Sequence, residues 1–582
     1  MRSSFLILTL FTLLLETGSA TTSQPRCRCL PSDSCWPKVD EWNTFNTSIS
    51  GKLLAVRPVA SVCHDPAFSE AACQEVNESF TFSLWRSNQP GAVDQINFEN
   101  SAVTNETCYI DAPRASPCGQ GNLPIYAIAA TSPQDIQKGV DFGRTHNLRI
   151  SIKNTGHDYL GRSVARGSLQ IWTHNMKGME FSDGFSPDGC NSSGKGESVV
   201  TIEAGVQLKE LYAAALALRK TLVVGFSNTV GAAGGYILGG GHSPLSPWKG
   251  MAADNALQFT VVTADGSHIT ANEYQNSDLF WALRGGGGGT FGVVTSVTLR
   301  TFPDVPMLLT SFNFTAPAEQ FWKFITDLHA FLPALDDANG AGYYWIFTDG
   351  PQPHFVMSTF FLNQTNVTPI HELYAPLIQA NQPNATLEYY TIPIESSAYL
   401  IDSLLVGTDS VGSQVVLGSR LISRKFLESK TGPDQLIQVL RKLAPNQATV
   451  FLGHIVAGGQ VTKNGHGSNA IDSAVNPAWR RAITHLIFAR GWDNTTPFSG
   501  QKEIMRNMTK VEMPLLKALE PDMGAYINEA DFNEDGWQQV FWGDNYPRLL
   551  SIKRKWDPKD VFMCKPCIGS ERWNAEGICR ID

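Results

Sequence analysis

The sequence is poor in basic clusters and in long apolar runs. Lys and Arg number 45 against 54 Asp and Glu, the net charge is -9, and no block of Lys or Arg occurs. A nucleic-acid-binding protein needs a basic surface to neutralise phosphates, so a nucleic-acid partner is excluded. No segment after the first 20 residues approaches the ~20 apolar residues that cross a bilayer. We therefore expect no membrane partner.

The one pronounced apolar run lies at the N-terminus. Arg2 precedes an apolar stretch from Phe5 to Leu15, and Gly18-Ser19-Ala20 follows it. This pattern predicts a signal peptide over residues 1–20 and a secreted protein, since the run is too short for the alternative, an anchoring helix. N-linked glycans are predicted at several of ten N-x-S/T sequons, which are Asn46, Asn77, Asn105, Asn191, Asn313, Asn363, Asn366, Asn384, Asn494 and Asn507.

Cysteine is missing from the middle of the chain, between Cys190 and Cys564. Seven of the 11 cysteines precede residue 119 and three follow residue 563. In a secreted protein this predicts disulfides that staple the two ends, with one thiol left over. The Cys564-x-x-Cys567 pair could also be a redox or zinc motif. No second Cys/His pair has zinc spacing, so a disulfide is favoured and no metal site is predicted.

The 582 residues predict more than one folding unit. Their mixed periodicities indicate an α+β protein. We expect a signal peptide (1–20), a loop-rich, Cys-rich N-terminal extension (21–120), a glycine-rich domain (121–303), a second α+β domain (304–520) and a C-terminal segment with a disulfide tail (521–582).

Apolar periodicity and turn residues place the main elements. A helix is expected to begin at Pro133 after the N-cap Ser132, and a hairpin to turn at Asp265-Gly266. Other helices are expected over 208–220 and 318–332. Strands are expected over 124–130, 149–154, 169–174, 198–205, 221–226, 354–363 and 448–459.

Three segments carry the chemistry. The first, SIKNTGHDYLGRS (151–163), places His157 after a strand; alone, such a histidine is more often structural. The second, GAAGGYILGGGHSPLS (231–246), and the third, RGGGGGTFGVVTSVTL (284–299), let the backbone approach a planar ligand or an anion. Neither glycine run ends in GKS/T, which disfavours a triphosphate loop, and the third run leads into a β-branched strand instead of the helix of a dinucleotide motif, which disfavours NAD-type binding.

Together with Ala253-Asp254-Asn255, these segments resemble the vanillyl-alcohol-oxidase-type (PCMH) FAD-binding domain over residues 121–303. YINEADF (526–532) and FWGDNYPRLLSIKRKWDP (541–558) resemble the flavin-covering tail of berberine-bridge-enzyme-like oxidases. CRCLPSDSCWP (27–37), NTGHDYLGRS (154–163), VNPAW (475–479) and the Cys-x-x-Cys tail are most similar to the secreted fungal isoamyl-alcohol-oxidase-like group. The resemblance implies a two-part FAD-binding domain with an inserted α+β substrate domain.

The resemblance also implies a covalent bond from His157 to FAD. Many such proteins add a bond from a cysteine before the first glycine cluster, but Ser227 or Asn228 stands there in this chain. Neither can form a thioether, so a single covalent link is expected. The residues expected to bind FAD are His157, Asn154, Thr155, Gly156, Asp158, Gly161, Gly234, Gly235, Gly239, Gly240, Gly241, Asp254, Asn255, Gly289, Gly292, Val293 and Val294.

The resemblance favours oxidation of an alcohol group of a small molecule or specialised metabolite, with O₂ as acceptor and H₂O₂ as product. Small residues at Val230 and Gly231 would permit O₂ access. Such chemistry needs a proton acceptor; the candidates are Tyr526, Asn528, Tyr546 and His242, with His354 and His454 as weaker ones. The alternatives are flavin-dependent dehydrogenation or ring closure in secondary metabolism and, as a minor one, a non-catalytic flavin-binding glycoprotein.

Overall fold

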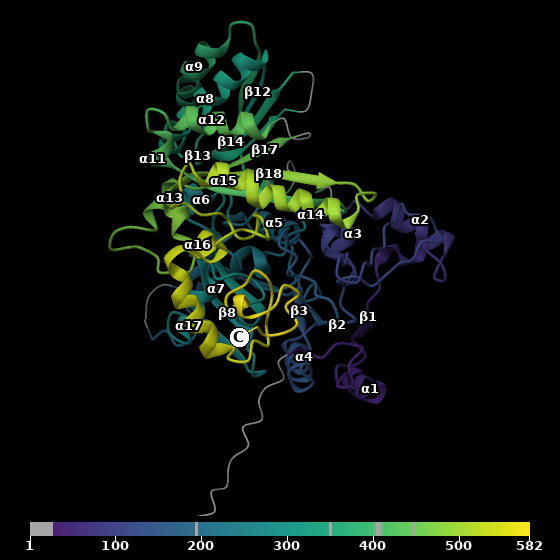
Figure 1. Ribbon diagram of the computed structural model, residues 1–582. Coiled ribbons are helices and arrows are strands. Elements are labelled where there is room, and N and C mark those ends of the chain that lie inside the picture. The colour runs from purple at the N-terminus through teal and green to yellow at the C-terminus, as the bar shows by residue number, and fades with distance from the viewer. Residues whose placement is uncertain are drawn as a thin grey trace, which may run out of the picture.

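The structure is a computed structural model that describes residues 27–191, 196–348, 352–400, 402, 409, 411–444 and 449–581. The predicted signal peptide lies outside the described residues. The chain forms a lower lobe of two sheets and an upper lobe built on one large sheet (Figure 1). Within the described ranges, no helix combines the length and apolarity that a bilayer crossing needs.

The first sheet of the lower lobe begins the glycine-rich domain. Its strands, in sheet order, are β1 (Leu53–Ala55), β2 (Tyr126–Ala129), β4 (Leu169–Trp172) and β3 (Ile150–Lys153). β2 and β3 both run parallel to β4. Helix α4 (Pro133–Thr145) begins with the predicted N-cap, because Ser132 and Asp135 form a reciprocal capping box. It packs Ile136 and Val140 into the core beneath the sheet.

The second sheet of the lower lobe is antiparallel. Its strands, in sheet order, are β5 (Met179–Phe185), β6 (Glu197–Glu203), β10 (Val293–Arg300), β8 (Ala256–Val262) and β9 (His268–Asn272). The β8–β9 hairpin turns at Gly266, whose φ of +85° explains the glycine in the predicted turn. The helices α5 (Leu208–Ala217), α6 (Ser246–Lys249) and α7 (Ser277–Leu283) lie in the chain between the strands of this sheet.

The upper lobe is a seven-stranded antiparallel sheet. Its strands, in sheet order, are β15 (Thr386–Ile394), β12 (Met307–Thr315), β14 (His354–Leu362), β13 (Gly340–Phe347), β17 (Val450–Ile455), β18 (Ala482–Trp492) and β16 (Gln414–Ser423). One face is covered by α8 (Ala318–Asp337), α9 (Thr368–Asn381) and α12 (Gly432–Leu443). In β13, Tyr344 and Ile346 enter that core, whereas Tyr343 and Trp345 point to the other face, as the two-residue period of a strand requires.

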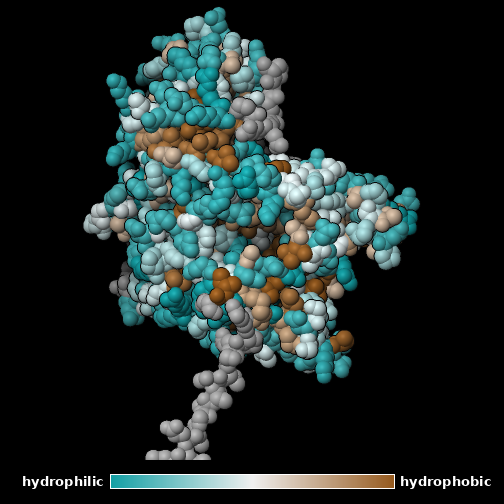
Figure 2. Space-filling view, in the orientation of Figure 1, coloured by the Kyte–Doolittle hydropathy of each residue, from teal (hydrophilic) through white to brown (hydrophobic). Residues whose placement is uncertain are grey.

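The face of the molecule seen in Figure 2 is mostly hydrophilic. Apolar side chains form a band there at the level of α12, β13 and β14, and smaller apolar patches lie lower on the same face.

The C-terminal segment returns to the lower lobe through α16 (Trp537–Trp542) and α17 (Tyr546–Trp556). Leu549 and Ile552 of α17 join the core of the glycine-rich domain. Trp542 donates a hydrogen bond of 3.1 Å from Nε1 to the carbonyl of Gly285, in the third predicted segment. The tail is thus packed against the glycine-rich domain, beside α7 (Figure 1).

The remaining elements are short. They are β7 (Lys220–Thr221), β11 (Phe302–Pro303), α1 (Val39–Ser48), α2 (Glu70–Ser79), α3 (Ser83–Ser87), α10 (Ser397–Tyr399), α11 (Arg424–Leu427), α13 (Gly459–Lys463), α14 (Phe498–Asn507), α15 (Met513–Lys517), the 3₁₀ helices Val59–Cys63, Ile96–Phe98, Ala252–Asn255, Pro477–Arg480, Gly543–Asn545 and Ser570–Arg572, and the π-helical turns Ala232–Tyr236 and Met508–Glu512.

Two sequence expectations differ from the structure. The strand expected over 221–226 ends at Thr221, because the following residues run as an extended segment without a sheet partner while Leu222, Val223 and Val224 stay buried. The extension over 21–120 has more regular structure than its composition indicates: α1, α2 and α3 lie in it, and its strand β1 pairs with β2.

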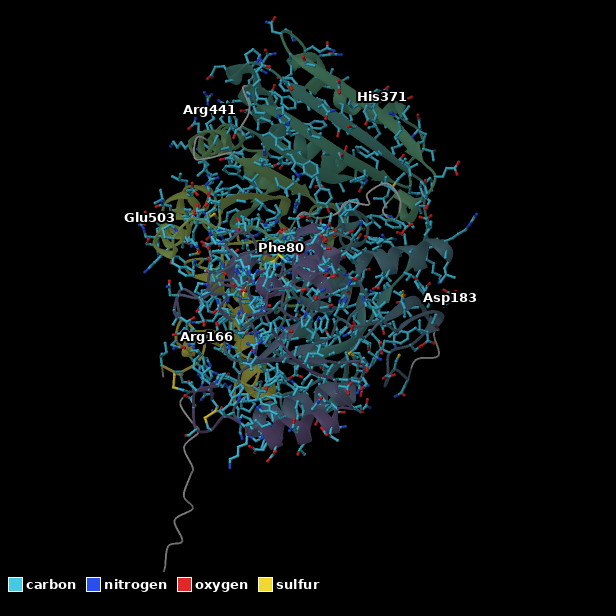
Figure 3. All side chains as sticks on the ribbon, turned by 90° about the vertical axis from the view of Figure 1, so that its right-hand side faces the viewer. Phe80, Arg166, Asp183, His371, Arg441 and Glu503 are labelled. Atoms are coloured by element: carbon cyan, nitrogen blue, oxygen red, sulfur yellow. A yellow bond between two sulfur atoms is a disulfide. The ribbon has the colours of Figure 1, made fainter. Side chains whose placement is uncertain are left out.

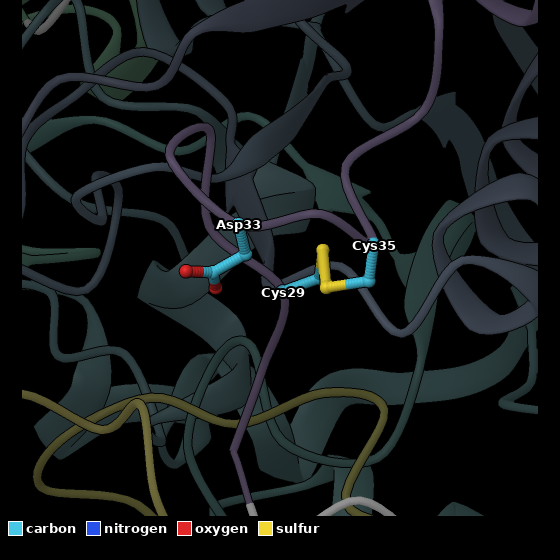
Figure 4. A group of neighbouring side chains, drawn as sticks. All are labelled: Cys29, Asp33 and Cys35. Atoms are coloured by element: carbon cyan, nitrogen blue, oxygen red, sulfur yellow. A yellow bond between two sulfur atoms is a disulfide. The ribbon is translucent and has the colours of Figure 1, made fainter.

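Five disulfides are present among the described residues. One joins the ends of the chain, as predicted, through Cys27 and Cys579, and Cys564 pairs with Cys567. The others are Cys29–Cys35, Cys63–Cys73 and Cys108–Cys118. Cys190 is outside these bridges and interacts with Tyr274. Asp33 lies beside the Cys29–Cys35 pair (Figure 4), but oxidised sulfurs are not thiolate ligands, so this group is not a metal site.

Candidate active site

A cavity of about 620 Å³ lies where the two lobes and the C-terminal segment meet. The glycine-rich domain supplies the loop after β3 and parts of both glycine runs; the seven-stranded sheet supplies its outward-facing side chains. Lining residues central to the site are Asp94, Asn154, Thr155, Gly156, His157, Asp158, Tyr159, Arg162, Ser227, Val230, Gly231, Gly234, Gly235, His242, Gly288, Gly289, Gly292, Val294, Tyr343, His454, Tyr526, Asn528 and Glu529.

His157 is held on both ring nitrogens. Its Nδ1 lies 2.7 Å from Oδ2 of Asp94, and its Nε2 lies 2.5 Å from Oγ1 of Thr229. Asp94 is fully buried and comes from the N-terminal extension. Burial opposes a charged imidazole, but the Asp94 carboxylate outweighs it and raises the pKa of His157. The pair fixes the ring at the cavity wall.

The glycine runs bring backbone segments together around the cavity. A Cβ on Gly231 would lie 2.4 Å from Nδ2 of Asn154, and one on Gly288 would lie 3.0 Å from the Cα of Gly235. Only glycine permits this approach, which leaves backbone next to the cavity. A Cβ on Gly235 would meet no protein atom within 4 Å.

Some buried polar atoms of the lining residues have no protein partner in the described part of the chain and are available to a polar ligand. Among the described residues, Nη1 of Arg162 and Oδ1 of Asn154 have no hydrogen-bond partner, although buried polar groups are normally satisfied. Arg162 is held in place through Asp158 and, at 3.0 Å, Oδ1 of Asn528. The glycine walls and these atoms fit the large, flat and polar FAD that the sequence predicts.

Three histidines surround one carboxylate in the same cavity region. Oε2 of Glu529 lies 3.3 Å from Nε2 of His242, 3.4 Å from Nδ1 of His454 and 3.5 Å from Nδ1 of His485. The three rings come from the second glycine segment, β17 and β18. Burial is the main cause that lowers the pKa of both His454 and His485, so these two imidazoles are neutral at neutral pH.

Tyr526 and Asn528 are neighbours in the structure as well. Nδ2 of Asn528 donates to the hydroxyl of Tyr526 at 2.7 Å and to the carbonyl of Gly235 at 2.9 Å. Burial and the charge of Glu529 raise the pKa of Tyr526. Its phenol therefore stays protonated at neutral pH, which makes it a better hydrogen-bond donor than a base.

Three expected site residues lie away from the cavity. Both carboxylate oxygens of Asp254 bind Arg480 at 2.7 Å. Asn255 donates to the carbonyls of Lys249 and Met251. The hydroxyl of Tyr546 donates to Glu571 at 2.6 Å. These contacts give the three side chains structural roles.

Five further residues expected at the flavin site, and His354, are not among the residues that line the cavity. Gly161, Gly240 and Gly241 adopt positive φ angles of +74°, +116° and +67° that only glycine accepts easily. Val293 belongs to the core under the first sheet, and a Cβ on Gly239 would meet the side chain of Asn528. His354 stacks on Phe347, with ring centroids 4.2 Å apart, outside the cavity lining.

Sequence reasoning missed Asp94, Thr229, Glu529, His485 and Tyr343. Asp94 and His485 carry no local motif, and they reach the site only because the extension and β18 pack against the other segments. Glu529 had a usable signal, since it stands within the YINEADF segment quoted for the tail.

A second hollow, of about 580 Å³, lies between α9 and β15 on the upper lobe. It is lined by His371, Tyr389 and Tyr390 with aliphatic, hydroxyl and amide side chains, and His371 is labelled on that lobe in Figure 3. It gathers no carboxylate and no glycine run, so the chemistry points to the cavity between the lobes.

Comparison with known proteins agrees with this geometry. The FAD binding domain family model matches residues 124–272, and the berberine and berberine-like model matches residues 525–569. An uncharacterized FAD-linked oxidoreductase of Arthroderma benhamiae is 49% identical over the whole of both chains. The chain belongs to the berberine-bridge-enzyme-like family of FAD-linked oxidoreductases.

Other members show the same relation. FAD-linked oxidoreductase notD of an Aspergillus species is 40% identical over 95% of this chain and 90% of its own. The crystal structure of the VAO-type flavoprotein MtVAO713 from Myceliophthora thermophila C1 has a TM-score of 0.88 at 29% identity, covering 96% of this oxidoreductase and 100% of that chain. The expected FAD-binding fold and the oxidoreductase class are therefore confirmed.

Proposed function

We propose that this oxidoreductase is a secreted enzyme that oxidises an alcohol group of a small molecule, with O₂ as electron acceptor. The observation that supports it most is that one cavity is lined both by His157 and by the polar side chains of Tyr526, Glu529 and His242. When bound, FAD would supply the two-electron oxidation, by accepting a hydride from the substrate carbon.

The chain's own residues would bind and orient the cofactor. His157 would carry the covalent link, and the backbones of Gly234, Gly235 and Gly288 would lie against the flavin. Arg162, with one nitrogen free of partners among the described residues, would donate to it. Asp94 would hold the His157 ring in its orientation.

We further propose that the link is single. The glucooligosaccharide oxidase of Acremonium strictum, a fold neighbour at 24% identity and a TM-score of 0.62, carries a 6-S-cysteinyl, 8α-N1-histidyl FAD. Here Ser227 lines the cavity and donates a hydrogen bond to Asp409, and Asn228 is its neighbour. The lining of the cavity, over the described residues, contains no cysteine.

The substrate would occupy the side of the cavity formed by the upper lobe. Tyr343, Trp345 and Phe360 give that side an aromatic surface, which suits an apolar or aromatic molecule. Tyr526 would donate a hydrogen bond to the substrate oxygen. The group around Glu529 would receive the proton that the hydroxyl loses on oxidation.

Export and glycosylation are part of the proposal. None of the ten sequon asparagines is buried, and six are exposed: Asn77, Asn105, Asn191, Asn363, Asn366 and Asn384. Nδ2 of Asn494 donates to Asp111 at 2.8 Å and Nδ2 of Asn77 donates to the carbonyl of Cys73 at 2.9 Å, and a glycan would have to replace these contacts. Five disulfides agree with an oxidising compartment.

A second candidate is dehydrogenation or oxidative ring closure of a specialised metabolite. The same lining would serve it, because both reactions begin by removing hydride and proton. The names of relatives include a flavin-dependent oxygenase, ucdF of Aspergillus ustus, 40% identical over 93% of this chain. Product analysis by mass spectrometry separates a carbonyl product from a cyclised one.

The test measures the flavin and the products separately. Purified protein is denatured and precipitated; the yellow colour should stay in the pellet, and His157→Ala should release it. H₂O₂ formation is then followed with panels of aliphatic, aryl and sugar alcohols. Release of flavin from fully loaded wild type would refute the covalent link. Absence of both flavin reduction and H₂O₂ with every alcohol would refute the alcohol oxidase.

A further inference from the structure

Glu529 and the three histidines around it, His242, His454 and His485, form the Glu529 cluster. Their nitrogen–oxygen distances are longer than those of ordinary ion pairs. Charge-assisted N–H···O bonds are about 2.7–2.9 Å long, whereas the three imidazole nitrogens stand 3.3, 3.4 and 3.5 Å from the same carboxylate oxygen. Only the contact from His242 has hydrogen-bond geometry. Nδ1 of His454 and both nitrogens of His485 have no hydrogen-bond partner among the described residues.

The same spacing suits ligands that share a metal ion. Metal–ligand distances of about 2.0–2.1 Å in a tetrahedral site place neighbouring ligand atoms about 3.3–3.4 Å apart. The donor atoms of His242, His454 and Glu529 all lie within 4.8 Å of one another, close enough for one ion to reach all three with small side-chain movements.

We propose that His242, His454 and Glu529 form a binding site for a divalent transition metal, with Zn²⁺ as the reference ion. Two imidazoles and one carboxylate are a ligand set of catalytic zinc sites, in which a fourth position stays open. All three residues line the cavity, so the open position faces the substrate space. His485 does not line it and lies behind Glu529 as an outer partner.

The ligands come from three parts of the chain. His242 lies in the second glycine segment, His454 lies in β17 and Glu529 lies in the tail. The sequence therefore has no metal-binding spacing, and the expectation of no metal site rested on local motifs alone. Tyr526 and Trp479 pack against the His242 ring, with centroids 5.2 and 6.1 Å away, and hold it in place.

The inference rests on the proposed function for its substrate class. A metal here would take the oxygen of a hydroxyl group as its fourth ligand, and so would select substrates with a hydroxyl that can reach the cavity wall. Coordination lowers the pKa of a bound O–H; with Glu529 occupied as a metal ligand, the proton would leave to water in the cavity in place of the Glu529 group. The C–H hydrogen and its electron pair would go to FAD, leaving a carbonyl.

The experiment uses the full-length holoenzyme. Protein treated with chelator and then dialysed is titrated with Zn²⁺, and the bound metal is measured by elemental mass spectrometry. We expect one equivalent of Zn²⁺ in wild type, and at least tenfold weaker binding in His454→Ala and in Glu529→Gln. His371→Gln, a change of an exposed histidine on α9, is the matched control and should bind like wild type. The melting temperature and flavin spectrum show that each variant folds.

Two results would overturn the site: no Zn²⁺ bound to wild type at micromolar concentrations, or equal binding by wild type and both cluster variants, which identifies an adventitious ion only. Turnover distinguishes this failure from failure of the proposed function. If metal-free enzyme oxidises alcohols at the full rate, the metal inference fails and the oxidase stands. If Zn²⁺ binds as expected but no alcohol reduces the flavin, the site stands and the alcohol oxidase fails.

Discussion

A substitution of Asp254 tests whether its carboxylate stabilises the fold or binds the flavin. The resemblance of its segment to FAD-binding domains places it at the cofactor, whereas the structure pairs it with Arg480, which lies in the 3₁₀ helix Pro477–Arg480 between β17 and β18. The carboxylate is completely buried and accepts four hydrogen bonds: two from Arg480, one from Asn464 and one from the backbone of Met251. It links the glycine-rich domain to the chain that carries the upper sheet.

The magnitude follows from what Asp254→Ala leaves behind. The Arg480 guanidinium would remain largely buried without its counter-ion, and breaking such a pair costs about 3–5 kcal/mol. An unfolding entropy of about 2.1 cal/mol/K per residue gives roughly 1.2 kcal/mol/K for the whole chain. The melting temperature should therefore fall by about 2.5–4 °C if the chain unfolds as one unit, and by more if the lobes unfold separately.

Differential scanning fluorimetry and the flavin content of the folded protein together test this role. Asp183→Ala, which changes an exposed carboxylate that contacts Lys220, is the control (Figure 3) and should leave the melting temperature unchanged. Burial would raise the pKa of Asp254, but the contacts from Arg480, Asn464 and Met251 together outweigh it and hold the pKa below its ordinary 3.8. Its contribution to stability is therefore complete above that value and is lost as the pH falls through the folded-state pKa. An unchanged melting temperature with lost flavin would refute the structural role.

Three further predictions concern flavin attachment to His157, the glycine at the cavity wall and the disulfide that joins the ends of the chain. Asp94→Asn should slow covalent flavin attachment by about 10–100-fold, by analogy with the loss on removing the carboxylate that orients a metal-bound histidine, measured as protein-bound flavin against time after adding FAD to apoprotein; an unchanged rate would contradict it. Gly235→Ala should leave the stability of the apoprotein unchanged, because the new Cβ meets no protein atom, but it should lower the flavin occupancy. The control is Gly184→Ala, a change of an exposed glycine whose Cβ also meets no protein atom. Equal flavin occupancy in the two variants would show that Gly235 does not contact the flavin. Replacing Cys27 and Cys579 by serine should destabilise the protein by about 2–5 kcal/mol in denaturant unfolding, and an unchanged midpoint would show that the bridge does not restrain the ends.

Local patterns predicted the elements that their own side chains determine. The capping box at Ser132 and the Gly266 turn are decided within a few residues, and both are present. The prediction of a strand after Thr221 was wrong, because the apolar residues there are buried against α5 and the glycine segment without a strand to pair with. An apolar pattern in the sequence indicates that residues are buried. Here the residues after Thr221 are buried but do not belong to a sheet.

The site was predictable only where a motif marks it. His157, Gly234 and Gly235 stand in recognisable segments and line the cavity. Asp94 and His485 lack such a signal, because their contacts join residues far apart in the sequence. Asp254 stands in a recognisable segment too, but its partner Arg480 decides its role, and no local pattern identifies that partner.

The cavity cannot belong to the glycine-rich domain alone. Asp94, which holds His157, lies in the N-terminal extension, and Glu529, which gathers three histidines, lies in the C-terminal segment. The Cys27–Cys579 bridge joins these two outer parts of the chain, and Lys553 of the tail donates to the carbonyl of Thr290 beside the third glycine run. A fragment of residues 121–303 would retain His157 and both glycine runs but lose the partner of His157 and the carboxylate of the cluster. The proposed flavin attachment and substrate chemistry would therefore depend on the packing of both chain ends against the central domain.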